Sequence, residues 1–295
     1  MVIDMGNDFP ASVQGYMDQL KCSVLVRDTP HRKTTRGRNI YGPGEYRSIF
    51  LDGTILIVSD FDYLTPKLQV VPEDLSVPLL GSKTFHLICS PKRAVSIIKG
   101  VLLRRQEHGI TVRPMFLWEP VPGVCSPADW PDCIEAIKLV DIISPNVNEA
   151  FSFLGKTIEE EVPFNQFKSQ VELITDEYLR HQMDGSGRAV VVRCGRYGCL
   201  VATNEMMRWL PAYHRNSEKV VDPTGGGNTF CGAFCIGWVR EQRDLVKAAE
   251  YGNIAASFAI EQFGMPRLQY EHGAEKWNGD TLERRRTVYQ AQVLS

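Results

Sequence analysis

The sequence predicts an α/β protein with a mainly parallel sheet covered by helices. From about residue 54, short runs rich in Val, Ile, Leu and Phe alternate with longer stretches of helical pattern. Such alternation is typical of βαβ units, in which helices join parallel strands and pack on the sheet. A chain of 295 residues with 43% hydrophobic content can bury a sizeable core without disulfides or metal ions. The predicted strands are 54–58, 85–89, 112–117, 140–143, 189–193 and 198–202.

Two of the predicted helices have clear boundary residues at both ends. Ser90 is a suitable N-cap, Pro91 fits the first helical position, and Gly109 is expected to end that helix. A later helix has Asp244 as its predicted N-cap and ends near Gly264. Both patterns place apolar residues at helical spacing between these boundaries, so both helices are expected to pack on the sheet.

Two further helices are predicted near the carboxyl end of the chain. The stretch 229–239 is apolar on every side, so it is expected to be a buried helix in which Gly232 and Gly237 permit close packing. A final helix is expected from residue 281, because Asp280 and Glu283 have the spacing of a capping box.

The first fifty residues differ from the rest of the chain. They are polar and rich in turn-forming residues, as in Asp-Thr-Pro at 28–30 and Tyr-Gly-Pro-Gly at 41–44. We therefore predict a small separate β element over residues 22–50, projecting from the sheet. Residues 1–21 and 51–295 are predicted to form the main α/β domain.

Charge and hydropathy exclude several classes of partner. The formal net charge is −2 and the isoelectric point is near 6.3, whereas nucleic-acid and anionic-membrane surfaces require a concentrated basic excess. The sequence has neither a long uninterrupted apolar segment nor the basic and then apolar pattern of a signal peptide. These features predict a cytoplasmic protein that binds neither nucleic acid nor membrane.

Cysteine and histidine patterns do not indicate a metal site. The eight cysteines include no C-x-x-C pair, and several lie within apolar runs, which is typical of reduced, buried thiols. The six histidines are scattered without ligand spacing to one another or to cysteine.

Three consecutive glycines open the predicted buried helix. Gly225, Gly226, Gly227 and Asn228 follow a strand-like segment at 219–221. Glycines free to adopt positive φ at a helix N-terminus present backbone N–H groups to an anion such as a phosphoryl group. The alternative is a tight turn without a ligand. A P-loop of the form G-x-x-x-x-G-K-S/T and an early G-x-G-x-x-G are both absent, so NAD binding is not predicted.

The segment around these glycines resembles the signature of the ribokinase-like (PfkB) carbohydrate kinases, which usually reads D-T-x-G-A-G-D. In that family the glycine amides form an anion hole and the final Asp removes a proton from the acceptor hydroxyl. The resemblance places Gly225, Gly226 and Gly227 in the anion hole, and Asn228 at the position of the base. The matching segment is Asp222-Pro223-Thr224-Gly225-Gly226-Gly227-Asn228, in which Asp222 and Thr224 are expected to lie beside the nucleotide.

Other matches to this family follow in the same order along residues 85–265. Asn146 and Glu149 resemble its N-x-x-E motif, which helps to organise Mg²⁺ and phosphate, here indirectly. Gly195 and Gly198 occupy matching places in the strand-turn-strand that borders the nucleotide, and Asn253 is similar to the helix edge near the adenine. The resemblance implies a three-layer α/β/α fold with a mainly parallel sheet and a small β lid, and ATP and Mg²⁺ as cofactors.

The amino-terminal segment is similar to a fungal branch of the family in which G-G-G-N replaces G-A-G-D. The similarity lies in Thr34-Thr35-Arg36-Gly37, in Asn39-x-Tyr41-Gly42 and in Leu117-Trp118-Glu119-Pro120. It implies that Arg36 and Asn39 lie near the substrate. The lid of such kinases often mediates dimers, so a homodimer through residues 22–50 is a possible assembly.

Two departures from the family pattern bear on activity. The amide of Asn228 cannot accept a proton near neutral pH, and general acid–base steps contribute about 10² to 10⁴ in rate. Phosphoryl transfer depends mainly on positioning and charge stabilisation, so slow transfer and nucleotide binding are compatible with Asn228. The family's first strand, with an acceptor-binding Asp and a G-G-x-x-x-N segment, is not found; we expect either an upstream start or a loss of part of the acceptor pocket.

These observations leave two hypotheses open. The chain is an attenuated kinase that transfers phosphate from ATP to a hydroxyl of a sugar-like or nucleoside-like small molecule, or it is a catalytically degenerate protein. In the second case it keeps the fold for nucleotide binding, regulation or an accessory role, for example in a fungal biosynthetic pathway.

Overall fold

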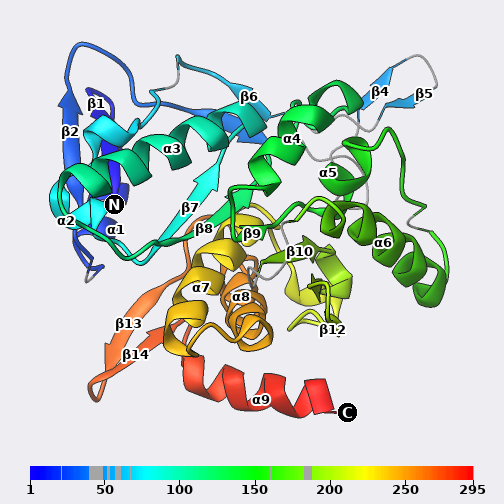
Figure 1. Ribbon diagram of the computed structural model, residues 1–295. Coiled ribbons are helices and arrows are strands. Elements are labelled where there is room, and N and C mark those ends of the chain that lie inside the picture. Colours follow the sequence, from blue (N-terminus) through cyan, green and yellow to red (C-terminus); the bar gives the residue numbers. More distant parts are fainter. Residues whose placement is uncertain are drawn as a thin grey trace. The chain divides into compact units, whose positions relative to one another are not determined.

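The computed structural model describes residues 1–20, 22–39, 49–51, 54–56, 61–66, 68–159, 161–182 and 188–294. These residues form two compact units, one built from residues 1–82 and 100–111 and the other from residues 83–99 and 112–295. Most of their helices and strands are labelled in Figure 1. None of the described helices combines the length and the apolar composition that crossing a membrane requires.

The first unit consists largely of short strand pairs. Strand β1 (Val2–Gly6) is parallel to β2 (Leu25–Thr29), and helix α1 (Ala11–Met17) connects them. The antiparallel pairs are β3 (Gly37–Asn39) with β6 (Phe61–Tyr63), and β4 (Ile49–Leu51) with β5 (Thr54–Leu56). The turn η1 (Pro72–Asp74), helix α2 (Val77–Leu80) and the second half of α3 (Pro91–Glu107) complete this unit.

The prediction that residues 54–58 form the first strand of the parallel sheet is wrong. Residues 54–56 form β5, which pairs antiparallel with β4, while residues 57 and 58 lie outside the described residues. Only two residues separate β4 from β5, and so short a connection can join only antiparallel neighbours, because a parallel crossover needs a dozen residues or more.

The second unit is built on a six-stranded sheet. Its mainly parallel character was predicted, whereas its strand β12 was not. The strand order is β12-β11-β10-β9-β8-β7. The four parallel strands are β7 (Thr84–Ile88), β8 (Met115–Glu119), β9 (Ile142–Ile143) and β10 (Ala189–Arg193). Two antiparallel strands, β11 (Cys199–Ala202) and β12 (Met207–Leu210), extend the sheet beyond β10.

Strand positions agree with the prediction more closely than strand ends do. The strand at 189–193 is confirmed without change, whereas the one predicted at 112–117 begins three residues later, after Pro114. Proline has no N–H to donate to a sheet, so a strand that is hydrogen-bonded on both sides starts after it. The strand-like segment 219–221 is not a strand: residues 217–219 form the turn η4 (Ser217–Lys219).

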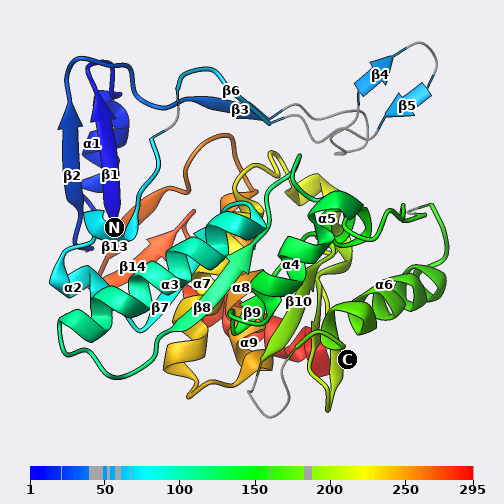
Figure 2. The same cartoon turned by 45° about the horizontal axis from the view of Figure 1, so that its top comes forward.

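Helices cover both faces of this sheet, which confirms the three-layer arrangement (Figures 1 and 2). On one face, the ring centroids of Trp118 and Phe153 are 6.4 Å apart, and those of Trp130 and Tyr178 are 5.0 Å apart. On the other face, Leu117 shares a core cluster with residues of α7 and α8. The first layer contains α4 (Trp130–Ile137), α5 (Val147–Ser152) and α6 (Phe164–Leu179), and the second contains α7 (Gly226–Arg240), α8 (Leu245–Ala259) and α9 (Leu282–Leu294).

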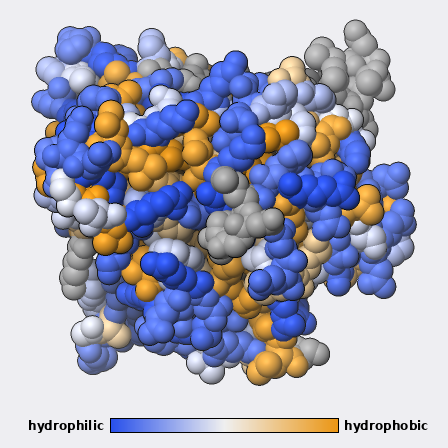
Figure 3. Space-filling model, viewed as in Figure 1, coloured by the Kyte–Doolittle hydropathy of each residue, from blue (hydrophilic) through white to orange (hydrophobic). Residues whose placement is uncertain are grey.

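Most cysteines are part of this core. All eight are free thiols, and all except Cys22 are buried, which confirms the prediction of reduced and mostly buried cysteines. On the face drawn in Figure 3, hydrophilic side chains surround smaller hydrophobic areas. This distribution agrees with the burial of most large apolar side chains between the layers.

Helix starts follow local capping chemistry. Helix α3 begins at Pro91, and Asp244 caps α8 by accepting a 3.0 Å bond from the Lys247 N–H, both as predicted. The capping box of Asp280 with Glu283 is a wrong prediction. The Thr281 hydroxyl instead accepts the Arg284 N–H at 3.2 Å, and Asp280 forms an ion pair with the Arg284 side chain.

Helix α7 is only partly enclosed, which corrects the expectation of burial on every side. Phe230, Phe234 and Gly237 are buried, but the Ile236 side chain is 52% exposed. A Cβ on Gly237 would lie 2.9 Å from Tyr251 Cβ of α8, whereas a Cβ on Gly232 would meet no atom within 4 Å. Close packing therefore depends on Gly237 and not on Gly232.

We expect Gly237→Ala to destabilise the protein by about 1–3 kcal/mol, because the added methyl group must push α7 away from α8. The matched control is Gly232→Ala in the same helix, where alanine is expected to stabilise by up to about 1 kcal/mol through its helix propensity. Urea unfolding of both variants measures the difference. Equal stabilities for the two variants would show that the contact between α7 and α8 is not tight at Gly237.

Candidate functional site

The glycine turn forms the N-terminus of α7. Gly225 has a φ of +83° and is the N-cap, and the Gly226 N–H donates to the Pro223 carbonyl at 3.1 Å. The first N–H groups of a helix have no partner within the helix, so those of Gly227 and Asn228 are placed to bind an anion. The Asn228 side chain is exposed at this end of the helix.

The segment before the turn is held by α8. The carbonyl of Ile260, which follows α8, accepts the Val221 N–H at 2.8 Å and the Asp222 N–H at 3.2 Å. The Asp222 carboxylate in turn accepts the Thr224 N–H at 2.9 Å. Asp222 and Thr224, which the resemblance placed beside the nucleotide, therefore shape the approach to the glycine turn.

Asn146 and Glu149 form a reciprocal capping box at the start of α5. The Glu149 N–H donates to Asn146 Oδ1, and the Asn146 N–H donates to Glu149 Oε2, each at 2.8 Å. Asn146 follows β9 at the carboxyl edge of the parallel strands. The N-x-x-E spacing thus has a local structural role, because it satisfies two N–H groups at a helix start.

Arg193 joins this capping box to the end of β8. It is the last residue of β10, and its side chain is 12% exposed. Its Nη1 lies 2.8 Å from Glu119 Oε1, and its Nη2 lies 3.4 Å from Glu149 Oε2. The same guanidinium donates to the Ser144 carbonyl from Nη2 at 3.0 Å and from Nε at 3.3 Å.

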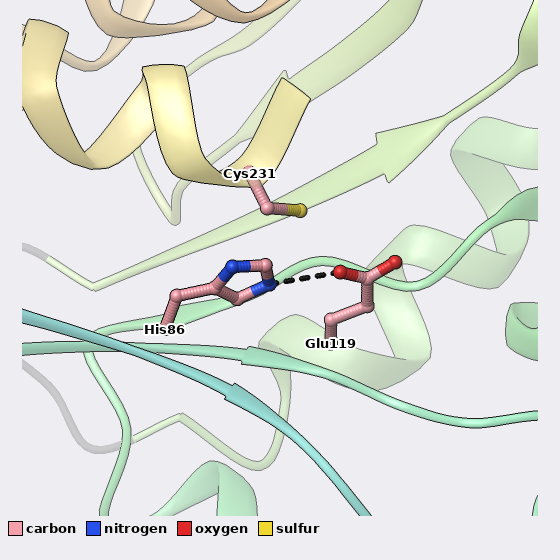
Figure 4. Close-up of side chains that lie close together, drawn as sticks. All are labelled: His86, Glu119 and Cys231. Carbon is pink, nitrogen blue, oxygen red and sulfur yellow. Dashed lines mark hydrogen bonds and ion pairs between the residues drawn. The ribbon is translucent and has the colours of Figure 1, made fainter. Parts of the chain in front are cut away.

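Glu119 also pairs with His86, the central residue of β7, as Figure 4 shows. The His86 Nε2 and Glu119 Oε2 atoms are 2.8 Å apart. Burial alone would raise the pKa of Glu119, but Arg193 and His86 hold it below its usual value. Glu119 is therefore a buried carboxylate held ionised between two basic groups.

Cys231 of α7 lies close to the pair formed by His86 and Glu119. Each of these three residues has one atom that could bind a metal ion, and these atoms all lie within 4.8 Å of one another. Burial raises the pKa of the Cys231 thiol well above its ordinary value, whereas a metal would require the thiolate. The guanidinium of Arg193 beside Glu119 further opposes a cation. These three residues are better described as a hydrogen-bonded pair beneath a buried thiol.

The first turn of α7 rests on the pair formed by Glu119 and Arg193. A Cβ on Gly227 would overlap Arg193 Nη1 and would lie 3.3 Å from Glu119 Oε1. A side chain at residue 227 would therefore require the Arg193 guanidinium to move away from the helix. The predicted anion hole, the N-x-x-E segment and the ends of β8 and β10 are thus adjacent in the second unit.

The turn between β10 and β11 contains the two glycines predicted to border the nucleotide. Gly195 and Gly198 have φ values of +51° and +84°, and the Gly198 carbonyl accepts the Cys194 N–H at 2.7 Å. Asn253, which the resemblance placed near the adenine, lies in α8 and not in this turn. Its side chain is buried, with 7% exposed, and its amide donates to Tyr289 Oη at 2.8 Å. The Asn253 side chain therefore belongs to the packing of α8 against α9.

The predicted acceptor residues belong to the first unit. The Arg36 guanidinium donates to Asp8 Oδ2 at 2.7 Å, and Asp8 also accepts the Thr34 N–H at 2.7 Å. The bond from Thr34 and the charge of Arg36 lower the pKa of Asp8. Asn39 ends β3, and its side chain lies outside what the structure describes.

Three residues of the second-unit site were not predicted from the sequence to be functional: His86, Glu119 and Arg193. Glu119 lies within the segment 117–120 that is similar to the fungal branch, but no function was predicted for it. All three lie in strands that are otherwise largely apolar, and Glu119 and Arg193 are the last residues of β8 and β10. A charged residue at the end of a predicted buried strand can be recognised in the sequence, and it indicates a candidate functional residue. Their mutual pairing is not visible in sequence, because they are 33 to 74 residues apart.

Mg²⁺, which the resemblance implies, does not fit direct coordination by Asn146 and Glu149. Mg²⁺ demands oxygen ligands in nearly ideal octahedral geometry, whereas Asn146 Oδ1 and Glu149 Oε2 each accept a backbone N–H. Arg193 lies against the same Glu149 oxygen, so a cation there would be repelled. An indirect contribution of Asn146 and Glu149 to Mg²⁺ binding stays a prediction.

Comparison with known proteins identifies similar sequences along nearly the whole chain. Residues 120–267 match the model of the pfkB family carbohydrate kinases. An uncharacterised protein of Schizosaccharomyces pombe is 31% identical and is matched over 98% of this chain and 79% of its own length. Protein MAK32 of Saccharomyces cerevisiae is 32% identical over 99% of this chain and 78% of its own length.

Solved structures show the same fold at lower sequence identity. The ribokinase of Giardia lamblia superposes with a TM-score of 0.64 at 14% identity, covering 99% of this chain and 82% of its own. The adenosine kinase of Anopheles gambiae gives 0.62 at 18% identity, covering 89% of this chain and 73% of its own.

Proposed function

Because this chain belongs to the pfkB family of carbohydrate kinases, we propose that it binds ATP at the glycine turn of α7 and transfers the terminal phosphoryl group slowly. The acceptor is a hydroxyl of a sugar-like or nucleoside-like small molecule. The observation that carries this proposal is the α7 N-terminus, which opens on Gly225 with positive φ at the carboxyl ends of the parallel strands.

The chemistry follows from backbone donors and fixed charge. The N–H groups of Gly227 and Asn228, together with the positive end of the helix dipole, stabilise negative charge on phosphate oxygens. Related structures contain the implied ligands: an Arabidopsis thaliana ribokinase was solved with ribose and ATP, and an Escherichia coli ribokinase II with ATP and Mg²⁺. In this chain we propose that Mg²⁺ arrives with the nucleotide, while Arg36 and Asn39 contact the acceptor.

Slow transfer is proposed because Asn228 occupies the position of the family's base. Its exposed amide can orient an acceptor hydroxyl but cannot remove its proton. Positioning and electrostatic stabilisation still lower the barrier, since the transition state of phosphoryl transfer is loose.

A second candidate function, nucleotide binding without transfer, is favoured by the pairing of the nearby carboxylates. Glu119 and Glu149 both form ion pairs with Arg193. Among the described residues of this cluster, neither carboxylate is therefore available to replace the base. A protein of this kind would respond to ATP or ADP without consuming it.

Nucleotide binding is expected under both candidates. ATP or ADP with Mg²⁺, at about 100 times its Kd, is expected to raise the free energy of unfolding by about 2.7 kcal/mol, which corresponds to a rise in Tm of about 5 °C for a chain of this size. Adenosine, which has no phosphates for the helix N-terminus, serves as the control and is expected to shift Tm much less. The absence of any shift with millimolar ATP or ADP would contradict both candidates.

A further inference from the structure

We propose that Arg193 is a fixed cation for the nucleotide phosphates, so that nucleotide binding depends only weakly on Mg²⁺. This inference rests on the proposed nucleotide binding and adds a phosphate-contacting residue to it. It begins from the misfit of Mg²⁺ at Asn146 and Glu149, where a guanidinium already lies 3.4 Å from the Glu149 carboxylate.

The guanidinium lies directly against the first turn of α7. A Cβ on Gly227 would overlap Arg193 Nη1, so this nitrogen is next to the backbone whose N–H groups are proposed to bind phosphate. An anion bound at this turn would therefore be close to a positive charge that comes from β10.

Within the part of the chain that the structure describes, Arg193 retains one hydrogen-bond donor at this position. A guanidinium has five N–H groups. Among the described residues, Ser144 accepts from Nε and Nη2, Glu149 accepts from Nη2, and Glu119 lies 2.8 Å from Nη1. These contacts use four N–H groups, and the fifth is on Nη1, the nitrogen beside Gly227.

The surrounding charges explain why the guanidinium can stay there. A cation near the positive end of a helix dipole is unfavourable by itself. Glu119 and Glu149 supply two negative charges against the single positive charge of Arg193, and the N-termini of α5 and α7 each contribute roughly half a positive charge. The cluster is therefore close to neutral, holds Arg193 rigidly, and needs no divalent cation for its charge balance.

Calorimetric titration of the full chain with ADP, in excess Mg²⁺ and in EDTA, tests this inference. The wild-type Kd is expected to rise less than about tenfold in EDTA, because Arg193 stays in place. The double variant Arg193→Met/Glu119→Gln removes the cation without leaving Glu119 unpaired. Its loss of affinity is expected to be about 10- to 100-fold in EDTA and smaller in Mg²⁺, since Mg²⁺ then supplies the missing charge.

Two further variants complete the test. Arg180→Ala removes a guanidinium from an exposed pair with Glu177 and is expected to bind as the wild type does. Arg193→Lys keeps the positive charge but loses the planar, bidentate geometry of the guanidinium. This variant is expected to bind ADP more weakly than the wild type in EDTA, and it provides the comparison if the double variant does not fold.

The outcomes separate this inference from the proposed function. A wild-type protein that binds ADP in Mg²⁺ but not in EDTA would overturn the role of Arg193. So would Arg193 variants whose affinity falls equally in both conditions, since that is the result of a purely structural role. If the wild-type protein binds ADP under neither condition, the proposed function itself fails.

Discussion

Replacing Asn228 by Asp is expected to raise the rate of phosphoryl transfer by about 10²- to 10⁴-fold, the usual contribution of a general acid–base group. Residue 228 is exposed in the first turn of α7, where a carboxylate is also favoured by the helix dipole. The new carboxylate would occupy the position of the family's base, beside the proposed phosphate site. ATP consumption against a panel of sugars, polyols and nucleosides measures the effect.

Asn228→Ala is the matched control for this substitution. It removes the amide without adding a carboxylate, so it is expected to give no increase in rate. If Asn228→Asp binds ATP with unchanged affinity and still transfers nothing to any acceptor of the panel, the slow-kinase proposal is contradicted. Nucleotide binding without transfer would then account for the glycine turn at the start of α7.

Gly198→Ala is expected to lower the free energy of unfolding by about 3 kcal/mol or more, a larger loss than that expected for Gly237→Ala. Gly198 has a φ of +84° and a ψ of −123°, a conformation that is open essentially to glycine alone. A Cβ there would overlap the Leu210 carbonyl oxygen and the backbone of Pro211. Backbone atoms of a neighbouring strand cannot move aside as a flexible side chain can.

The control is Gly195→Ala in the same turn. Gly195 also has a positive φ, +51°, but a Cβ there would meet no atom within 4 Å. Only the left-handed backbone would then be strained, at a cost of about 1–2 kcal/mol. Urea unfolding of both variants measures the difference. If Gly198→Ala is no less stable than Gly195→Ala, the close approach of β12 to this turn is not rigid.

The parallel layout could be predicted from the sequence because its strands are short apolar runs between helical segments. Residues 189–193 are the clearest case, since all but Arg193 are apolar and the strand is buried between two helical layers. The prediction that residues 54–58 form a strand of the parallel sheet was wrong, because β-forming residues do not show with which neighbouring strand they will pair. Local pattern predicts an extended segment, whereas the pairing of β5 with β4 depends on which strand lies beside it.

The candidate site was predictable to a similar degree. The glycine turn could be identified because its chemistry is local: three glycines and a following apolar helix define an anion-binding helix start. Asn146 and Glu149 were identified by resemblance, but their reciprocal capping bonds and their link to Arg193 were not predicted. The assignment of Asn253 to the nucleotide stays a prediction, and its amide bonds Tyr289.

By itself, then, the sequence determined that this chain has a mainly parallel α/β sheet and a glycine-rich helix start with Asn228 in place of a carboxylate. Both features depend on neighbouring residues, whose spacing and backbone freedom are set along the chain. Only the tertiary structure brought His86, Glu119, Arg193 and Glu149 together beneath that helix start. Ion pairing acts through space over a few ångströms, and sheet formation decides which strand ends come that close.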